Sequence, residues 1–132
     1  MNKKSIRWQQ RYENYIRALK QLEEAAEIIQ PSPVEQAGLI QFFEMTFELA
    51  WKTLKDHLES KGQLLVSPRD VLKQAFQNGL IQDGEQWLKA LQSRNLTAHL
   101  YDEKKALELF SEIKTNYLPI LIDLRNHLKN EL

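Results

Sequence analysis

The chain has 132 residues, of which 42% are hydrophobic and 27% charged, as in an ordinary soluble globular domain. This length accommodates one hydrophobic core but not two, so we expect residues 1–132 to form a single domain. Eighteen basic and eighteen acidic residues cancel, which excludes a strong overall positive field. Any contact with RNA therefore has to come from a local patch of charge.

The composition also limits the compartment and the chemistry. There is no cysteine, which excludes disulfides and cysteine-ligated metal sites. The basic first residues are followed by glutamines and Arg11 instead of an apolar stretch, so they do not resemble a signal peptide. No run approaches the roughly 20 apolar residues that span a bilayer. We therefore expect a cytoplasmic protein without a membrane contact.

The first predicted helix has one apolar stripe. Its hydrophobic side chains recur at steps of three and four, which places them on one face of a helix: Trp8, Tyr12, Tyr15, Ile16, Leu19, Leu22, Ala26 and Ile29. Pro31 and Pro33 cannot continue a helix and should end it.

The second predicted helix, about residues 34–61, has two apolar lines. One consists of Phe42, Met45 and Leu49. The other lies roughly a right angle away and consists of Phe43, Phe47, Ala50, Trp51, Leu54 and Leu58. So wide an apolar surface is buried on two sides, either within the bundle itself or partly against a second subunit. The pattern leaves both possibilities open. His57 falls on the apolar side, where a core or interface histidine is expected.

Capping residues delimit the next two helices. Gly62 marks the end of the second helix, and residues 67–70 (Ser-Pro-Arg-Asp) form an N-terminal signature for a third. Asn78 and Gly79 should end that helix. Residues 83–86 (Asp-Gly-Glu-Gln) form another capping signature, which opens a short fourth helix.

The last predicted helix begins at Tyr101 or Asp102. Its apolar residues align on one face: Ala106, Phe110, Ile113, Tyr117, Leu121, Leu124 and Leu128. Pro119 lies inside this helix and should kink it, because proline frees the carbonyl four residues earlier. The whole pattern predicts an all-α bundle of three long and two short helices.

A short polar stretch, residues 93–102, separates the last two helices. It contains Arg94, His99 and Tyr101, which are a fixed cation, a group that titrates near neutral pH and a phenol. On an uninterrupted helix Arg94 and His99 would diverge by roughly 140°. They can meet over one substrate only if the helix is broken or tightened between them, or if a second subunit supplies the partner group.

Each of these residues also has a purely structural interpretation. Arg94 suits the negative end of a helix dipole, and a lone histidine beside an apolar run is more often structural than catalytic. Tyr101 could be a core ring, and Asp102 could be the N-cap of the last helix. The three histidines show no metal-ligand spacing, and the glycines form no phosphate loop. Any chemistry therefore falls on residues 94–101.

The spacing Arg94, His99, Tyr101 is similar to the Arg-x4-His-x-Tyr motif of the HEPN superfamily, in its HepT-like branch. That branch is also described as nucleotidyltransferase substrate-binding proteins. Residues 43–52, 67–70, 79–81 and 94–97 resemble further landmarks of the family. The resemblance extends from about Val34 to the C-terminus. It implies an antiparallel up-and-down bundle of four to five helices that dimerises.

The resemblance also implies an activity and a partner. Characterised toxin–antitoxin members are metal-independent ribonucleases, restrained by a small nucleotidyltransferase (of the MntA type) that adds AMP to the motif tyrosine, here Tyr101. No cofactor and no metal are implied, and the substrate is RNA, with tRNA among the candidates. We assign acid/base catalysis to His99 and a phosphate clamp to Arg94. Asn95 would position the phosphate or orient the histidine.

Three hypotheses follow from the sequence. The first is a dimeric endoribonuclease toxin that a nucleotidyltransferase restrains. The second is a non-catalytic subunit that binds the substrate of a separate nucleotidyltransferase, which the zero net charge favours mildly. The third is a helical dimer whose polar stretch only shapes an interface. The presence of Arg94, His99 and Tyr101 together favours the first, because a scaffold has no need for all three.

Overall fold

A computed structural model describes residues 3–95 and 101–132 of the chain. Every regular element in these residues is helical, as the sequence predicts. In order they are α1 (Lys3–Ala26), α2 (Pro33–Ser60), α3 (Pro68–Gln77), α4 (Gly84–Asn95), α5 (Glu103–Glu112), the π-helical segment η2 (Ile113–Tyr117) and α6 (Leu118–Lys129). The last three follow one another without a break and form one long helix, so the described chain has five helices.

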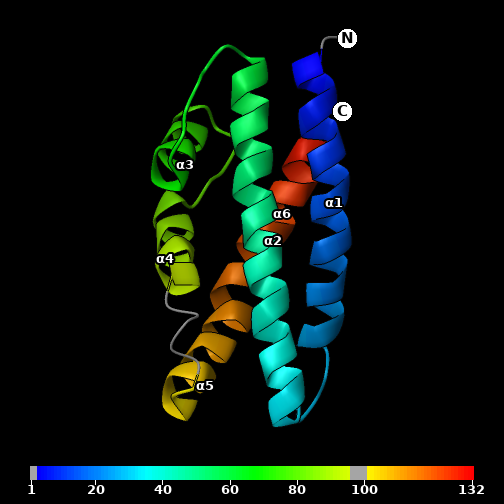
Figure 1. The fold of residues 1–132 in the computed structure, drawn as a ribbon, viewed down its shortest axis with the longest axis vertical. Coiled ribbons are helices and arrows are strands. Elements are labelled where there is room, and N and C mark those ends of the chain that lie inside the picture. Colours follow the sequence, from blue (N-terminus) through cyan, green and yellow to red (C-terminus); the bar gives the residue numbers. More distant parts are fainter. Residues whose placement is uncertain (1–2, 96–100) are drawn as a thin grey trace.

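The two long helices α1 and α2 run in opposite directions, and the last helix runs in the same overall direction as α2 (Figure 1). In Figure 1, α1 and α2 run as two long antiparallel rods, and α3 and α4 lie one below the other along one side of α2. The α5–α6 helix crosses the bundle from the foot of α2 and ends near the start of α1. This arrangement is the up-and-down bundle that the resemblance implies.

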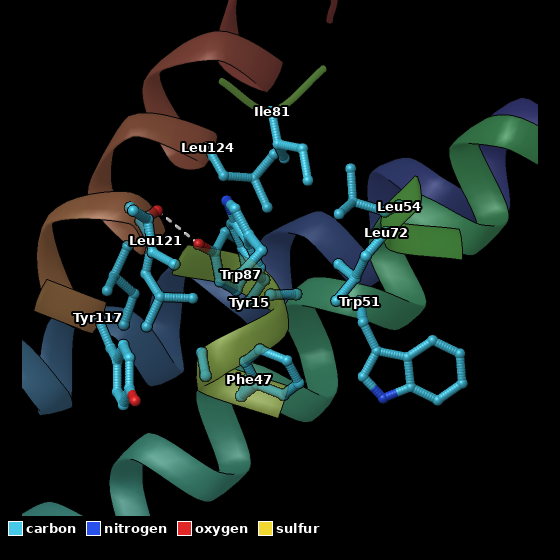
Figure 2. Packing of buried hydrophobic residues seen from close by; sticks show 14 of the residues in the cluster. Tyr15, Phe47, Trp51, Leu54, Leu72, Ile81, Trp87, Tyr117, Leu121 and Leu124 are labelled. Carbon is cyan, nitrogen blue, oxygen red and sulfur yellow. Dashed lines mark hydrogen bonds between the residues drawn. The ribbon is translucent and has the colours of Figure 1, made fainter. Parts of the chain in front are cut away.

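The core forms where the apolar faces of these helices meet. The Phe43 line of α2 is buried in it, as are the stripe of α1 from Trp8 to Leu22 and the face of α6. Trp87 of α4 is the largest side chain that is almost fully enclosed, and its ring lies 6.0 Å from that of Phe47. Figure 2 shows these rings together with Tyr15, Leu121 and Leu124. Large buried rings such as these contribute strongly to the stability of a core.

Two tyrosines attach α1 to α6. The hydroxyl of Tyr12 donates to the carbonyl of Arg125 at 2.9 Å, and the hydroxyl of Tyr15 donates to the carbonyl of Leu121 (Figure 2). Tyr15 is fully buried, and burial raises its pKa well above the usual value. It therefore remains a neutral donor, so the core contains no uncompensated charge at this contact.

Side-chain caps set the helix starts close to the predicted positions. Ser67 accepts from the backbone N–H of Asp70 at 3.1 Å, and Asp102 accepts from the N–H of Lys104 at 3.0 Å. Gly62 and Gly79 have φ values of +88° and +77°, so each ends a helix in the left-handed region that glycine tolerates. The predicted boundaries at these four positions are confirmed to within two residues.

Three details differ from the sequence-based prediction. The first helix ends at Ala26, so Ile29 lies outside it and is 89% exposed. The proline-rich segment that ends this helix also starts the next one, because Ser32 and Glu35 form a reciprocal capping box there. Ahead of Pro119 the chain adopts the π-helical segment η2, in which the N–H of Leu118 reaches the carbonyl of Ile113. A proline inside a helix requires such a local change of hydrogen bonding.

Candidate functional site

The last turn of α4 carries Arg94 and Asn95. Tyr117 of η2 holds the end of this helix in place. Its hydroxyl lies 2.7 Å from the Ser93 hydroxyl and donates to the Lys89 carbonyl at 3.4 Å. The Tyr117 ring stacks on Phe43 of α2, with centroids 5.4 Å apart. Burial raises the pKa of Tyr117, although the Ser93 hydrogen bond opposes this shift. Arg94 therefore projects from a helix end that is anchored in the core.

The Arg94 side chain points to α2. Its Nη1 atom lies 2.7 Å from Oε1 of Glu48, and the two side chains are 23% and 31% exposed. The other oxygen of Glu48 accepts a hydrogen bond of 2.7 Å from the indole N–H of Trp51, and Lys52 Nζ lies 3.9 Å from that oxygen. The carboxylate of Glu48 thus connects the cation of the motif to a tryptophan one turn along α2. The position of Arg94 in the last turn is also the one that a purely structural arginine prefers.

Tyr101 lies on the other side of the polar stretch, just before the N-cap of α5. Its side chain is 84% exposed, so the alternative that Tyr101 is a core ring is wrong. The prediction that Asp102 caps the last helix is confirmed, and α5 begins with its own cap instead of continuing α4. His99 lies outside the described residues, as does the point at which the helix was predicted to break or tighten.

Glu48 also borders the second apolar line of α2. Phe42 and Leu49 are half-buried and Met45 is 45% exposed, so this line stays at the surface of the subunit while the Phe43 line fills the core. A shallow hollow of about 450 Å³ is lined by Gln41, Glu44, Met45, Glu48 and Leu49. The two faces of α2 therefore have different surroundings, and the Arg94 contact lies beside the one that this subunit leaves partly exposed.

The described parts of the chain contain neither a candidate metal site nor a candidate membrane span. Residues 3–95 and 101–132 contain no cluster of three or more histidine, aspartate or glutamate side chains placed to hold a metal ion. None of the helices in these ranges combines the length and hydropathy needed to cross a bilayer. His57, the other histidine near α2, is buried against Trp8, as its sequence position predicted.

Comparison with known proteins identifies the family. The profile of the family described as "Nucleotidyltransferase substrate binding protein like" matches residues 10–130. The chain belongs to this family. A curated relative from Haemophilus influenzae, "Probable ribonuclease HepT", is 34% identical over an alignment of 93 residues, and the match covers 64% of this chain and 64% of that protein. The match thus spans somewhat less than two thirds of the relative's length.

Solved structures share the fold. A Thermus thermophilus protein matches 89% of this chain and 97% of its own, with 35% identity and a TM-score of 0.75. A Haemophilus influenzae protein, described as revealing the fold of a substrate binding domain of a nucleotidyltransferase, has 29% identity and a TM-score of 0.80 over 89% of this chain and 98% of its own. A chain of a structure described as a toxin-antitoxin with AMP-PNP has a TM-score of 0.65 over 96% and 98% of the two chains, but its 17% identity supports the fold alone.

The role of Glu48 is not evident from the sequence alone. The structure joins this residue to Arg94 across 46 positions of sequence. One signal was present in the sequence. Glu48 and Trp51 stand three residues apart within the segment 43–52 that resembles the family, and side chains at this spacing are neighbours on a helix.

Proposed function

We propose that this protein is a cytoplasmic, metal-independent endoribonuclease that acts as the toxin of a two-component module. Its antidote is a small nucleotidyltransferase, which transfers AMP to Tyr101. The observation that carries the proposal is the orientation of Arg94, which stands five residues before His99 in the sequence and whose guanidinium lies 2.7 Å from Glu48. The 34% identity to "Probable ribonuclease HepT" and the family description support the two halves of the module.

The motif residues suit RNA cleavage. A base removes the proton of a ribose 2′-hydroxyl, whose oxygen attacks the adjacent phosphorus, and an acid protonates the leaving 5′-oxygen. The products are a 2′,3′-cyclic phosphate and a 5′-hydroxyl, so no other reactant is needed. His99 performs the acid/base steps, Arg94 stabilises the charge that develops on the phosphate, and Asn95 orients the phosphate or the histidine.

The proposed dimer supplies a second motif. Two copies of His99 in one cleft would provide a base and an acid, one for each proton transfer. We place the subunit interface on the Phe42, Met45 and Leu49 line of α2, because it is apolar and remains at the surface. Met45→Glu should dissociate the dimer in analytical ultracentrifugation, whereas Phe76→Glu, at a half-exposed phenylalanine on α3, should leave it intact. If neither variant dissociates the dimer, this interface is excluded.

AMP addition to Tyr101 explains how the nucleotidyltransferase restrains the ribonuclease. The exposed phenol of Tyr101 can reach the active site of a second protein, which transfers AMP from ATP to the phenolic oxygen and releases pyrophosphate. The adduct is bulky and anionic, and it lies two residues from His99. It therefore blocks RNA both by its volume and by charge repulsion.

A second candidate function is a non-catalytic subunit that binds the substrate of the nucleotidyltransferase. The description of the 29%-identical Haemophilus influenzae structure favours it, as does the zero net charge of the chain. In that case Arg94 and Tyr101 would contact the substrate of the partner enzyme, and no RNA cleavage would occur.

Cleavage of total tRNA by the purified protein in excess EDTA separates the two candidates. We expect cleavage by the wild type and a loss of about 100-fold or more in His99→Ala, since acid/base groups contribute that much. His127→Ala is the control, because His127 is a partly exposed histidine on α6, outside the motif. If a dimeric sample without an adduct cleaves no tRNA, the binding-subunit function replaces the ribonuclease.

A further inference from the structure

We infer that Glu48 is the positioning residue of the motif: its carboxylate, itself oriented by the indole of Trp51, fixes the direction of the Arg94 guanidinium. The inference builds on the proposed function, because it assigns a role to a residue outside the Arg-x4-His-x-Tyr motif. It concerns a group on α2, which lies far from the motif in the sequence.

The contacts form a short relay from the core to the motif. Trp51 is 9% exposed, so most of its ring is fixed by packing, and in Figure 2 its indole lies at the edge of the core cluster. Its N–H is a donor only and bonds to one oxygen of Glu48 at 2.7 Å. The second oxygen of Glu48 is thereby directed to Arg94 Nη1, also at 2.7 Å. Each oxygen of the carboxylate thus has a defined direction.

The relay changes how Arg94 can act. A guanidinium on its flexible stem samples many orientations, and ordering it costs conformational entropy when substrate binds. A carboxylate that holds one terminal nitrogen limits the orientations of the group beforehand. Glu48 therefore reduces the cost of aligning Arg94 with the phosphate in the transition state.

The charge of Glu48 gives the inference a distinctive kinetic signature. A carboxylate beside a phosphate-binding arginine lowers the local positive potential, so it opposes the initial binding of RNA. A residue retained for affinity would have the opposite charge. Removing the carboxylate should accordingly lower kcat for RNA cleavage without raising KM.

A matched pair elsewhere in the bundle provides the control. Arg125 of α6 contacts Glu23 of α1 with the same Nη1–Oε1 distance of 2.7 Å, and its two side chains are 29% and 31% exposed. Glu23→Gln therefore breaks the same kind of pair, with similar burial, at a place remote from the motif. Any general effect of breaking an arginine–glutamate pair appears in both variants.

The kinetic test compares Glu48→Gln, Glu48→Asp and Glu23→Gln in the cleavage of tRNA. We expect Glu48→Gln to lower kcat about tenfold with KM unchanged or reduced, and Glu48→Asp to restore part of the loss. Glu23→Gln should leave both constants at their wild-type values. In an Arg94→Gln background, Glu48→Gln should cause no further loss, because a positioning residue has no effect once the group that it positions is gone.

A spectroscopic test stands apart from activity. The chain has three tryptophans, so its NMR spectrum contains three indole N–H signals, and Trp51→Phe identifies that of Trp51. We expect both Glu48→Gln and Arg94→Gln to shift this signal, and Glu23→Gln to leave it in place. If Arg94→Gln leaves the Trp51 signal unshifted, the inferred relay is overturned.

The outcomes separate the two proposals. Cleavage that Glu48→Gln affects no more than Glu23→Gln overturns the positioning role and leaves the ribonuclease standing. Absence of cleavage by the wild type overturns the ribonuclease, and the Trp51 signal then decides whether Glu48 fixes Arg94. A rise in KM with unchanged kcat in Glu48→Gln would also contradict the inference, because it would mean that Glu48 serves binding.

Discussion

Two arginine–glutamate pairs in this bundle have the same length and similar burial but different surroundings. Arg94 meets Glu48 between α4 and α2, and Arg125 meets Glu23 between α6 and α1, each at 2.7 Å. Glu48 also accepts a hydrogen bond from Trp51, and Arg94 belongs to the polar stretch of residues 93–102 in the sequence. The second contact of Arg125 stays within its own helix, because its Nε–H donates to Oδ1 of Asn126 at 3.4 Å. The two pairs therefore differ in their surroundings and not in their own geometry, and the role that we propose for Arg94 rests on the groups on either side of its pair.

The largest effect that we predict separates the region around Arg94 from the region around Arg125, and it concerns Tyr101. Tyr101→Phe should abolish AMP addition by the cognate nucleotidyltransferase completely, because phenylalanine has no acceptor oxygen. Intact-mass measurement after incubation with the partner and ATP checks this. Tyr12→Phe, in the region of Arg125, should still accept one AMP, since Tyr12 is buried against α6. Modification of Tyr101→Phe would exclude Tyr101 as the acceptor.

The next test compares neighbouring residues of α2. Phe47 is fully buried against Trp87, and Glu48 lies at the surface beside Arg94. Phe47→Ala should lower the free energy of unfolding by about 3–5 kcal/mol, the usual cost of emptying a large aromatic site. Urea unfolding followed by circular dichroism measures it. A loss below about 1 kcal/mol would mean that this part of the core repacks, contrary to the burial that we describe.

The two glutamates should be alike in stability, although they differ in function. Glu48→Gln and Glu23→Gln should each change the free energy of unfolding by at most about 1 kcal/mol, because solvent screens pairs that are about a quarter to a third exposed. The same urea titrations provide the comparison. A much larger loss in Glu48→Gln would indicate a structural role and would weaken any kinetic argument based on that variant.

The smallest effect that we predict is a pH dependence at the Arg125 side of the bundle. Burial lowers the pKa of His57, although Glu131 opposes the shift, and Lys61 and His127 add to the lowering. A lowered pKa in the folded state means that unfolding takes up a proton below about pH 6.5. Stability is therefore complete above that pH and falls as the pH drops towards the folded-state pKa.

His57→Gln removes this titration. The urea midpoint of the variant should vary less than that of the wild type between about pH 7.5 and pH 5.5. The pH dependence of RNA cleavage should stay unchanged, because we assign it to His99. A cleavage profile that shifts in His57→Gln would show that the two regions are coupled.

Local chemistry explains why much of the fold could be predicted. Ser67 and Asp102 cap helices through bonds that span three residues or fewer, and the step of three and four in residues 8–22 identifies a buried face directly. A cap is formed within one helical turn, and the apolar spacing repeats from turn to turn, so both signals can be recognised in the local sequence. The position of Pro119 similarly predicted a disturbance of the last helix, but not that the disturbance would take the π-helical form of η2.

The candidate site was less accessible to such reasoning. Arg94, Asn95 and Tyr101 were found by motif spacing, and their catalytic and acceptor roles stay predictions. The contact of Glu48 with Arg94 could not be predicted, because it depends on how α4 packs against α2, which no local pattern encodes. The exposure of Tyr101 is a similar case, since an apolar ring beside a helix start fits a core position equally well until the packing is known.

The central claim is that Arg94 acts on RNA and that Arg125, in a matching ion pair, does not. The most direct test is the rate of tRNA cleavage in excess EDTA by Arg94→Gln and Arg125→Gln, assayed side by side with the wild type. The account predicts a loss of about 100-fold or more for Arg94→Gln, as for removal of a group that stabilises transition-state charge. Arg125→Gln should stay within about threefold of the wild type, as expected for a partly exposed pair away from the site. Equal losses in the two variants, or no loss in either, would contradict it.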